Sequence, residues 1–428
     1  MGPDSRWRHV RGWRRRPTGR IGLRRVALIG LWLSLYTYYP LGLAEATVIP
    51  MFVGGLFAVP LMYLNRRNAR LREVGILYAV LLVAFATTLV ANGMSITPSE
   101  SKALVLLGYS LFIAYALYME LRTWSARALL RLFTASVILV VVGSAFEVFA
   151  GFQGVSDAVR ESVFGYSARY DRLRDITLAG RPRPSFFTAE PSDVAKFTAL
   201  AGSCALGLAW HLGYRWLFVG LVALAGAGMW IIRSPITAIP AGVVILVAID
   251  SVLSLTRRIK PRPLHIVLLV CAASVGTGVI YGTLKERLTS VTRGEDMSYT
   301  VRIGLPAAVG LSVMQREPVF GLGLGSRRLA SEFGLGATGR GNEYLVNALV
   351  GFPIYLGLVG SLALLFLVVM AVRLMGGRRY VWALGMAGAM SLTIGSAYSP
   401  RLWCFYMVIL AVGVHMTAVS SGRRLISS

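Results

Sequence analysis

The sequence predicts an all-α, polytopic integral membrane protein, and two observations carry the prediction: the composition and the pattern of apolar runs. Of the 428 residues, 56% are hydrophobic and 15% are charged, and the mean hydropathy is +0.64. Soluble domains carry charge on about 25% of their residues. Apolar runs of about 20 residues, each long enough to cross a hydrocarbon core of ~30 Å, recur along the chain and predict about twelve transmembrane helices. We expect residues 1–428 to form a single membrane domain without internal repeats.

Each predicted span is one of these apolar runs. The spans cover residues 22–41, 43–64, 73–92, 102–119, 132–151, 194–212, 215–232, 236–254, 264–282, 344–371, 380–397 and 402–420. Residues 1–21 form a basic tail ahead of the first span. No small-residue cleavage pattern follows that span, so we interpret the N-terminal region as an uncleaved signal anchor.

Lysine and arginine residues separate onto one side of the predicted spans. Of the 44 basic residues, 26 fall on this side, with almost no acidic residues beside them: the arginines before Val26, the basic residues of the connectors at 66–72, 122–131, 257–262 and 373–379, and Arg215, Arg423 and Arg424. The positive-inside rule makes this side cytoplasmic, so both termini are expected inside the cell. The same rule accounts for the net charge of +25. We therefore expect the lipid bilayer as a partner and no nucleic acid.

Two long loops, residues 152–195 and 283–343, interrupt the otherwise short connections on the opposite side. Both loops mix basic and acidic residues, and loops longer than about 15 residues are uncommon in compact folds unless they are functional. Within the second loop, residues 299–315 form a mostly apolar stretch bracketed by Arg302 and Arg316. This stretch is too short for a span and predicts an interfacial helix. We place the chemistry of the protein in these two loops.

The first candidate site is the segment 181–192, which reads RPRPSFFTAEPS. It ends in Pro-Ser, which is typical of a helix start, and a helix N-terminus offers unpaired N–H groups to an anion. Arg181 and Arg183 beside such a helix start predict a cradle for a diphosphate, and Glu190 is the nearby carboxylate that can accept a proton from an attacking hydroxyl. The alternative is a solvated loop with an ordinary helix cap.

Two further arginines face the same side. Arg233 follows the apolar run that ends the seventh span. Its side chain either extends to the lipid headgroups or takes part in the site, and the free-energy cost of placing an arginine near the bilayer favours considering it as a functional residue. Arg302 opens the interfacial helix and faces the same compartment as Arg181 and Arg183.

The remaining motifs indicate structure more than chemistry. The segment 316–328, REPVFGLGLGSRR, is expected to be a glycine-rich turn, because no β-strand precedes it as nucleotide binding would require. The cysteine and histidine residues lack metal-ligand spacing, so no metal is expected. Glu147 and Asp250 lie toward the ends of spans, where water is expected to reach them.

The order of these elements resembles the bacterial O-antigen ligase and O-antigen polymerase superfamily. The resemblance covers residues 180–365 best. The matching features are an Arg-containing turn with Phe and Glu-Pro-Ser, an arginine in the next outer turn, Ser298-x-x-x-Arg302, Pro318-x-x-Gly321-x-Gly323-x-Gly325, Asn342-x-Tyr344-Leu345, and a span with Gly351, Gly357 and Gly360.

The resemblance implies a GT-C-type glycosyltransferase of the bacterial inner membrane, with a periplasmic active site and no metal or other cofactor. Its substrate would be an oligosaccharide linked to undecaprenyl diphosphate, and a chain-length regulator is a possible partner. The residues carried over for the diphosphate are Arg181, Arg183, Arg233 and Arg302; Glu190, Arg302 and Arg183 would be catalytic. The acceptor side would use Arg340, Asn342, Glu343 and Tyr344.

The sequence departs from the ligases at Gly341, where they carry a histidine, and at Ile232, where the family carries a serine. The Glu-Pro-Ser variant resembles polymerase members. We therefore expect a polysaccharide polymerase, with a ligase that transfers glycan to lipid A-core as the alternative. A twelve-span secondary transporter is the alternative of another class; against it, the two halves show no similarity, and the long loops lie outside.

Overall fold

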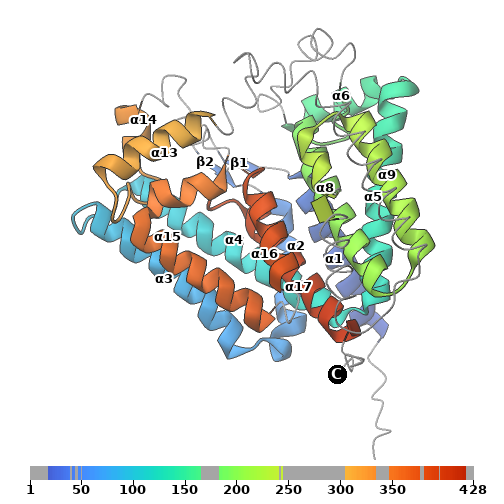
Figure 1. Cartoon of the computed structure of the whole chain (residues 1–428), viewed down its shortest axis with the longest axis horizontal. Helices are drawn as coiled ribbons and strands as arrows, with labels where there is room; N and C mark the ends of the chain where they lie inside the picture. The colour runs from blue at the N-terminus through green and yellow to red at the C-terminus, as the bar shows by residue number, and fades with distance from the viewer. Residues whose placement is uncertain are drawn as a thin grey trace, which may run out of the picture.

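The computed structural model describes residues 18–38, 41–43, 47–49, 51–164, 183–240, 242–243, 304–333, 347–375, 380–394 and 396–420. Within them the chain is helical apart from one short hairpin, as the apolar runs predict (Figure 1). The helices are α1 (Thr18–Thr37), α2 (Phe52–Asn65), η1 (Arg66–Asn68), α3 (Leu71–Ala91), α4 (Pro98–Thr123), α5 (Ala126–Phe149), α6 (Gln153–Phe164), α8 (Pro191–His211), α9 (Arg215–Ile232), η3 (Pro235–Ala238), α13 (Leu305–Arg316), α14 (Arg328–Phe333), α15 (Ala348–Met375), α16 (Tyr380–Ser391) and α17 (Pro400–Ser420).

Six of the helices within the described residues are long and apolar enough to cross a membrane. They are α3, α4, α5, α9, α15 and α17. The chain is therefore a multi-pass membrane protein, as its composition predicts. The predicted span 264–282 and most of the predicted span 236–254 lie outside the described residues.

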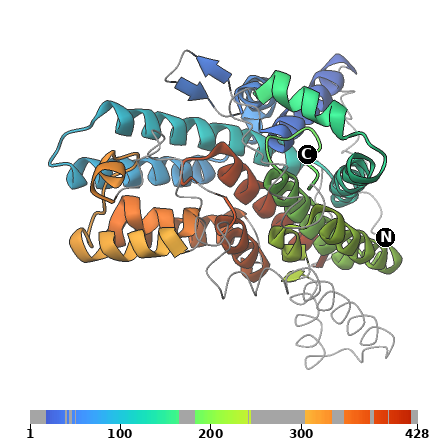
Figure 2. The same cartoon turned by 90° about the horizontal axis from the view of Figure 1, so that it is seen from above.

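The helices form three neighbouring groups. At one side α3 and α15 run alongside each other, and α13 packs on α15; at the other side α5, α8 and α9 form a second group (Figures 1 and 2). Between them, α17 packs along α4, and it also contacts α8. Helix α8 is buried from Pro191 to Ala209, so it lies inside the bundle and does not face lipid along that length.

The predicted start of the second span at residue 43 is wrong. Residues 41–43 and 47–49 pair as an antiparallel hairpin, β1–β2, with Leu41 opposite Ile49. Helix α2 begins only at Phe52, because Met51 before it has a left-handed backbone, with φ 53°. The β-branched residues of β2 favour a strand over a helix.

Other helix boundaries differ for identifiable reasons. Helix α4 begins at Pro98, four residues before the predicted start, because Thr97 and Glu100 form a capping box that sets its first turn. In the stretch 299–315, predicted to be helical, the structure has α13, Leu305–Arg316, which packs against α15; residues 299–303 lie outside the described residues. The loop 152–195 contains a helix, α6, that the sequence analysis did not predict.

Helix α15 is broken at Gly357, whose φ of 61° and ψ of −167° are open only to glycine. The glycine turn, residues 317–327 between α13 and α14, fills this break. Leu322 N–H donates to the carbonyl oxygen of Ile354 at 3.0 Å, and Leu358 N–H donates to that of Pro318 at 2.9 Å. A Cβ on Gly357 would overlap the carbonyl oxygen of Val319.

The glycine turn is therefore a buried part of the bundle. Residues 321–326 are buried, and Leu324 N–H donates to Thr88 Oγ1 of α3 at 3.0 Å. Arg328 ties the two ends of the turn, pairing with Glu317 at 3.0 Å and Glu332 at 2.7 Å. The hydrogen bond from Arg328 holds the pKa of Glu332 below its usual value.

One end of the bundle carries a buried ion-pair network. Arg24 Nε lies 2.7 Å from Glu120 of α4, and Asn65 at the end of α2 bonds both groups. Arg122 pairs with Glu73 beside them. The two buried carboxylates, Glu120 and Glu73, neutralise part of the positive charge at this end of the bundle. The connectors predicted to be cytoplasmic lie at the same end.

Candidate functional site

At the opposite end of the bundle, α1, α5 and α9 end and α8 and α17 begin; we call this the α8 N-terminal end. Ring contacts connect these termini. Phe187 contacts Phe152 at 6.1 Å between centroids, and Phe149, at the end of α5, stacks on Trp230 at 5.6 Å. Trp230 lies three residues before Arg233, so the segment preceding α8 and the end of α9 lie at the same end of the molecule.

The turn before α8 is built around Glu147. This carboxylate is 2% exposed and accepts hydrogen bonds from Ser185 N–H at 3.1 Å, from Ser185 Oγ at 3.2 Å, and from Phe186 N–H. The expectation that water reaches Glu147 is therefore wrong. Asp250, the other residue of that expectation, lies outside the described residues.

Phe186 and Phe187 both have positive φ, 28° and 62°. Consecutive bulky residues with positive φ are rare and strained, so surrounding contacts must hold them. Glu147 binds the backbone on one side, and Tyr36 Oη donates to the carbonyl oxygen of Phe186 on the other. Gly143 of α5 makes room for the ring of Phe186, since a Cβ there would overlap it. Strain of this kind concentrates at functional sites.

Three buried charges meet next to this turn; we call them the Asp193 cluster. Asp193, in the first turn of α8, accepts from Lys196 Nζ at 3.0 Å and from Arg401 Nη1. Asp193 is 8% exposed, Lys196 9% and Arg401 4%. Two cations share one carboxylate, which leaves the cluster with a formal charge of +1.

Arg401, in the first turn of α17, is held on several sides. Its guanidinium lies 4.0 Å from the centroid of the Tyr38 ring, and its Nη2 donates weakly to the carbonyl oxygen of Tyr36 at 3.4 Å. Its Nε, although buried, has no hydrogen-bond partner among the described residues. The planar fork is thus fixed in orientation while one of its donors remains unused.

A chain of hydrogen bonds connects the Asp193 cluster to the surface. Lys196 Nζ donates to Ser192 Oγ at 3.3 Å, and Ser192 Oγ donates to Glu190 Oε2 at 3.0 Å. Glu190 is exposed and precedes α8 as its N-cap. The exposed carboxylate is therefore one hydroxyl away from a buried ammonium group.

The structure describes three of the residues predicted for the site, and it places all three at the α8 N-terminal end. Arg183 is half-buried and leads into the strained turn, and Glu190 occupies the N-cap position of α8 without a side-chain capping bond. Arg233 is half-buried and ends α9 with a left-handed backbone, φ 52°. Six other predicted residues lie outside the described residues: Arg181, Arg302, Arg340, Asn342, Glu343 and Tyr344.

The sequence analysis did not single out Lys196, Arg401 or the role of Glu147. One signal was available, because charged residues inside apolar helices are rare and commonly functional. The pairing itself was not available, since 208 residues separate Asp193 from Arg401.

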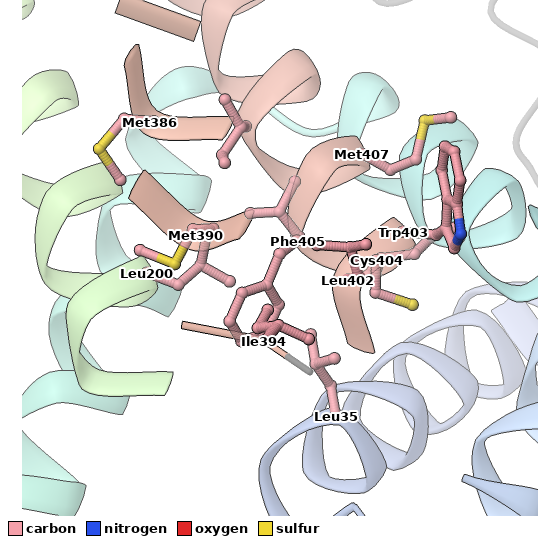
Figure 3. Packing of buried hydrophobic residues seen from close by; sticks show 14 of the residues in the cluster. Leu35, Leu200, Met386, Met390, Ile394, Leu402, Trp403, Cys404, Phe405 and Met407 are labelled. Carbon is pink, nitrogen blue, oxygen red and sulfur yellow. The ribbon is translucent and has the colours of Figure 1, made fainter. Parts of the chain in front are cut away.

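Below the Asp193 cluster the bundle is apolar. Leu35, Leu200, Ile394, Leu402 and Phe405 come from four segments and form a common buried core (Figure 3). Apolar surroundings lower the local dielectric constant and so strengthen the electrostatic interactions within the Asp193 cluster. The arrangement is suited chemically to holding an anion at one end of the bundle.

Lower in the bundle, a small apolar cavity of about 40 Å³ lies between α3, α15, α16 and α17. Its lining includes Leu77, Val80, Val368, Ala387 and Leu410.

Comparison with models of protein families and with curated proteins found no match to this chain.

Proposed function

We propose that the protein is a membrane glycosyltransferase of surface polysaccharide assembly, most specifically a polymerase. It would transfer a growing glycan from undecaprenyl diphosphate to a lipid-linked repeat unit. The observation that carries the proposal is that Arg183, Arg233 and Glu190 lie at the same end of a membrane bundle as the buried Asp193 cluster. The sequence resemblance to the O-antigen ligase and polymerase superfamily supports the reaction class.

The proposed chemistry follows from these residue types. A hydroxyl of the acceptor sugar attacks the anomeric carbon of the donor, the bond from that carbon to the diphosphate oxygen breaks, and the hydroxyl proton passes to Glu190. Undecaprenyl diphosphate leaves as an anion. Arginine stabilises that anion because its planar fork donates bidentately to phosphate oxygens and stays protonated. Each charge-assisted bond contributes about 1.5–3 kcal/mol, and bonds that strengthen in the transition state raise the rate.

We further propose that the α8 N-terminal end faces the periplasm of a bacterial inner membrane and that both chain termini are cytoplasmic. The opposite end holds the basic connectors between α2 and α3 and between α4 and α5, which the positive-inside rule places in the cytoplasm. Helix α13 would then lie near the periplasmic membrane surface.

The test is the surface-glycan profile of a deletion strain complemented with variants. The wild-type gene is expected to restore long glycan chains, and Arg183→Ala and Arg302→Ala are expected to abolish them while the protein still reaches the membrane. Arg67→Ala, an exposed arginine at the opposite end, is the matched control and is expected to leave chain length unchanged.

The deletion also separates polymerase from ligase. A strain lacking a polymerase retains core carrying a single repeat unit, whereas a strain lacking a ligase shows bare core. Normal chain lengths from both the Arg183→Ala and Arg302→Ala strains would contradict the assigned roles.

A secondary transporter is the second candidate, and two observations favour it. Helix α15 is discontinuous at Gly357, and ionisable side chains are buried in α8 and α17. Transporters use both features at their substrate sites. A deletion strain with an unchanged glycan profile and a defect in uptake or export of a small solute would support this function over the first.

A further inference from the structure

The connector between α2 and α3, residues 66–72, presents cations and a large apolar side chain together on the surface of the bundle. All four of its arginines are exposed: Arg66, Arg67, Arg70 and Arg72. Leu71, which lies between the last two arginines, is 91% exposed. A partner that suits both kinds of side chain must offer negative charge and apolar material side by side.

The backbone of this connector is held from inside the bundle by groups that are themselves paired. Arg122 of α4 donates through Nη2 to the carbonyl oxygen of Asn68 at 2.6 Å, and it also pairs with the buried Glu73. Asn65, just before the connector, is fully buried and donates to Glu120 at 2.7 Å. The connector is therefore fixed in a conformation that leaves its arginines exposed.

The exposed arginines find little negative charge within the protein. Arg70 lies 3.7 Å from Glu73. Arg66, Arg67 and Arg72 have no carboxylate within ion-pair distance among the residues that the structure describes. The positive charge of the connector is therefore available to an anion outside the chain.

Two stripes of exposed apolar residues lead to this connector. On α2 the stripe is Leu56, Val59 and Tyr63, and Arg66 lies over the ring of Tyr63, 4.1 Å from its centroid. On α3, which is long and apolar enough to span a membrane, the stripe is Leu71, Val74, Tyr78, Leu82 and Phe85. Spacings of three and four residues place each stripe on one face of its helix. The arginines thus lie where the lipid-facing surface ends, at the level of the headgroups.

We propose that the 66–72 connector binds the headgroups of anionic phospholipids in the leaflet at this end of the bundle. The lipid phosphates accept hydrogen bonds from Arg66, Arg67 and Arg72, and Leu71 lies at the level where the acyl chains begin. Arginine suits this position because its planar fork donates bidentately to phosphate while its aliphatic stem lies along apolar surface. Basic residues next to a span attract anionic lipids, and the fixed backbone here keeps three of them together. The proposal does not depend on the proposed function.

The experiment measures which lipid lies next to the connector. Ala69, exposed between the arginines, is replaced by cysteine in a cysteine-free background and labelled with a fluorophore. The full-length protein is reconstituted into vesicles of phosphatidylcholine and phosphatidylglycerol, in which one lipid at a time carries a nitroxide quencher on its acyl chain. Phosphatidylglycerol is expected to be preferred over phosphatidylcholine by at least about fivefold, because each arginine near an anionic lipid surface contributes roughly fivefold in affinity.

The double variant Arg67→Gln/Arg72→Gln is expected to lower this preference to below about twofold, because two phosphate-binding groups are lost. Arg67→Lys/Arg72→Lys retains the charge and loses only the bidentate geometry, so it is expected to keep part of the preference. Neither arginine forms an ion pair with the described part of the chain, so both variants are expected to fold, which size-exclusion chromatography verifies.

Arg127→Gln/Arg131→Gln is the matched control. Both arginines are exposed at the same end of the bundle, so this variant loses the same charge outside the connector. It is expected to leave the preference for phosphatidylglycerol unchanged. An equal loss of preference in the two glutamine variants would show that net charge attracts the lipid without a role for the connector, and it would overturn the proposal.

Three further outcomes would also overturn it. Equal quenching of the wild-type label by the two lipids would show that the connector does not distinguish them, and quenching by neither would show that another surface covers it. Soluble glycerol phosphate has no acyl chains and is expected not to displace the lipid; displacement would identify a free anion as the ligand. The glycan profile of the deletion strain does not bear on these results, so a failure here is distinguishable from a failure of the proposed function.

Discussion

Glu147 shows how a single buried carboxylate can shape the segment that precedes α8. Its oxygens accept from two consecutive backbone N–H groups and one hydroxyl group, and they hold Phe186 and Phe187 in positive-φ conformations. We expect Glu147→Gln to destabilise the protein by about 1–3 kcal/mol, because the amide turns an N–H₂ group toward a backbone donor and leaves that donor unsatisfied.

The measurement is the midpoint of thermal unfolding in detergent. Glu332→Gln is the matched control, since it removes a carboxylate from an exposed ion pair with Arg328, and exposed pairs contribute only about 0–1 kcal/mol. An unfolding midpoint for Glu147→Gln equal to that of the control would show that the turn does not depend on this carboxylate.

The same residue scale explains what the sequence analysis missed. Glu147 lies near the end of a span, a position for which the sequence predicts contact with water. It is buried because Ser185 and Phe186 fold back over it. The role of Arg401 depends on Asp193, which lies on another helix. Segments distant in the sequence create both environments, so composition and periodicity do not reveal them.

At the scale of elements, α15 and the glycine turn form one structural unit. The break at Gly357 frees backbone groups, and the glycine turn pairs with them through four hydrogen bonds, at 3.0, 2.9, 2.9 and 3.1 Å. We expect Gly357→Ala to destabilise the protein by at least about 1–3 kcal/mol, because alanine is strained at this φ and ψ and its Cβ overlaps Val319.

Gly351→Ala is the matched control in the same helix, because an added Cβ there meets only the Tyr355 ring, at 4.0 Å. It is expected to be neutral or slightly stabilising, since alanine favours a helix. Equal unfolding midpoints for the two variants, measured in the same detergent, would show that the break is not required. The sequence predicted the span and the glycine-rich turn separately, but their pairing needs a contact that neither segment specifies.

At the scale of the molecule, the two polar ends of the bundle predict a sidedness. Arg67 lies at the end that carries the basic connectors, and Met94, 71% exposed, lies between α3 and α4 at the other end. In a cysteine-free background with the protein in spheroplasts, we expect Met94→Cys to react with a membrane-impermeant thiol reagent and Arg67→Cys to react only after lysis. The reverse labelling pattern would place the α8 N-terminal end in the cytoplasm and contradict the proposed periplasmic site.

The composition by itself predicted a membrane protein, because crossing a bilayer requires long apolar helices. The positions of the basic connectors along the chain predicted which helix ends lie together at one end of the bundle and which lie at the other. Local residue chemistry correctly anticipated that a helix starts at Pro191. The break in α15 and the Asp193 cluster depend on contacts between distant segments. The segments that pack against a buried charge decide whether that charge is paired, and the same holds for a backbone group that a helix break leaves without its helical partner. In this chain the partner of the buried Asp193 carboxylate, Arg401, lies 208 residues away in the sequence.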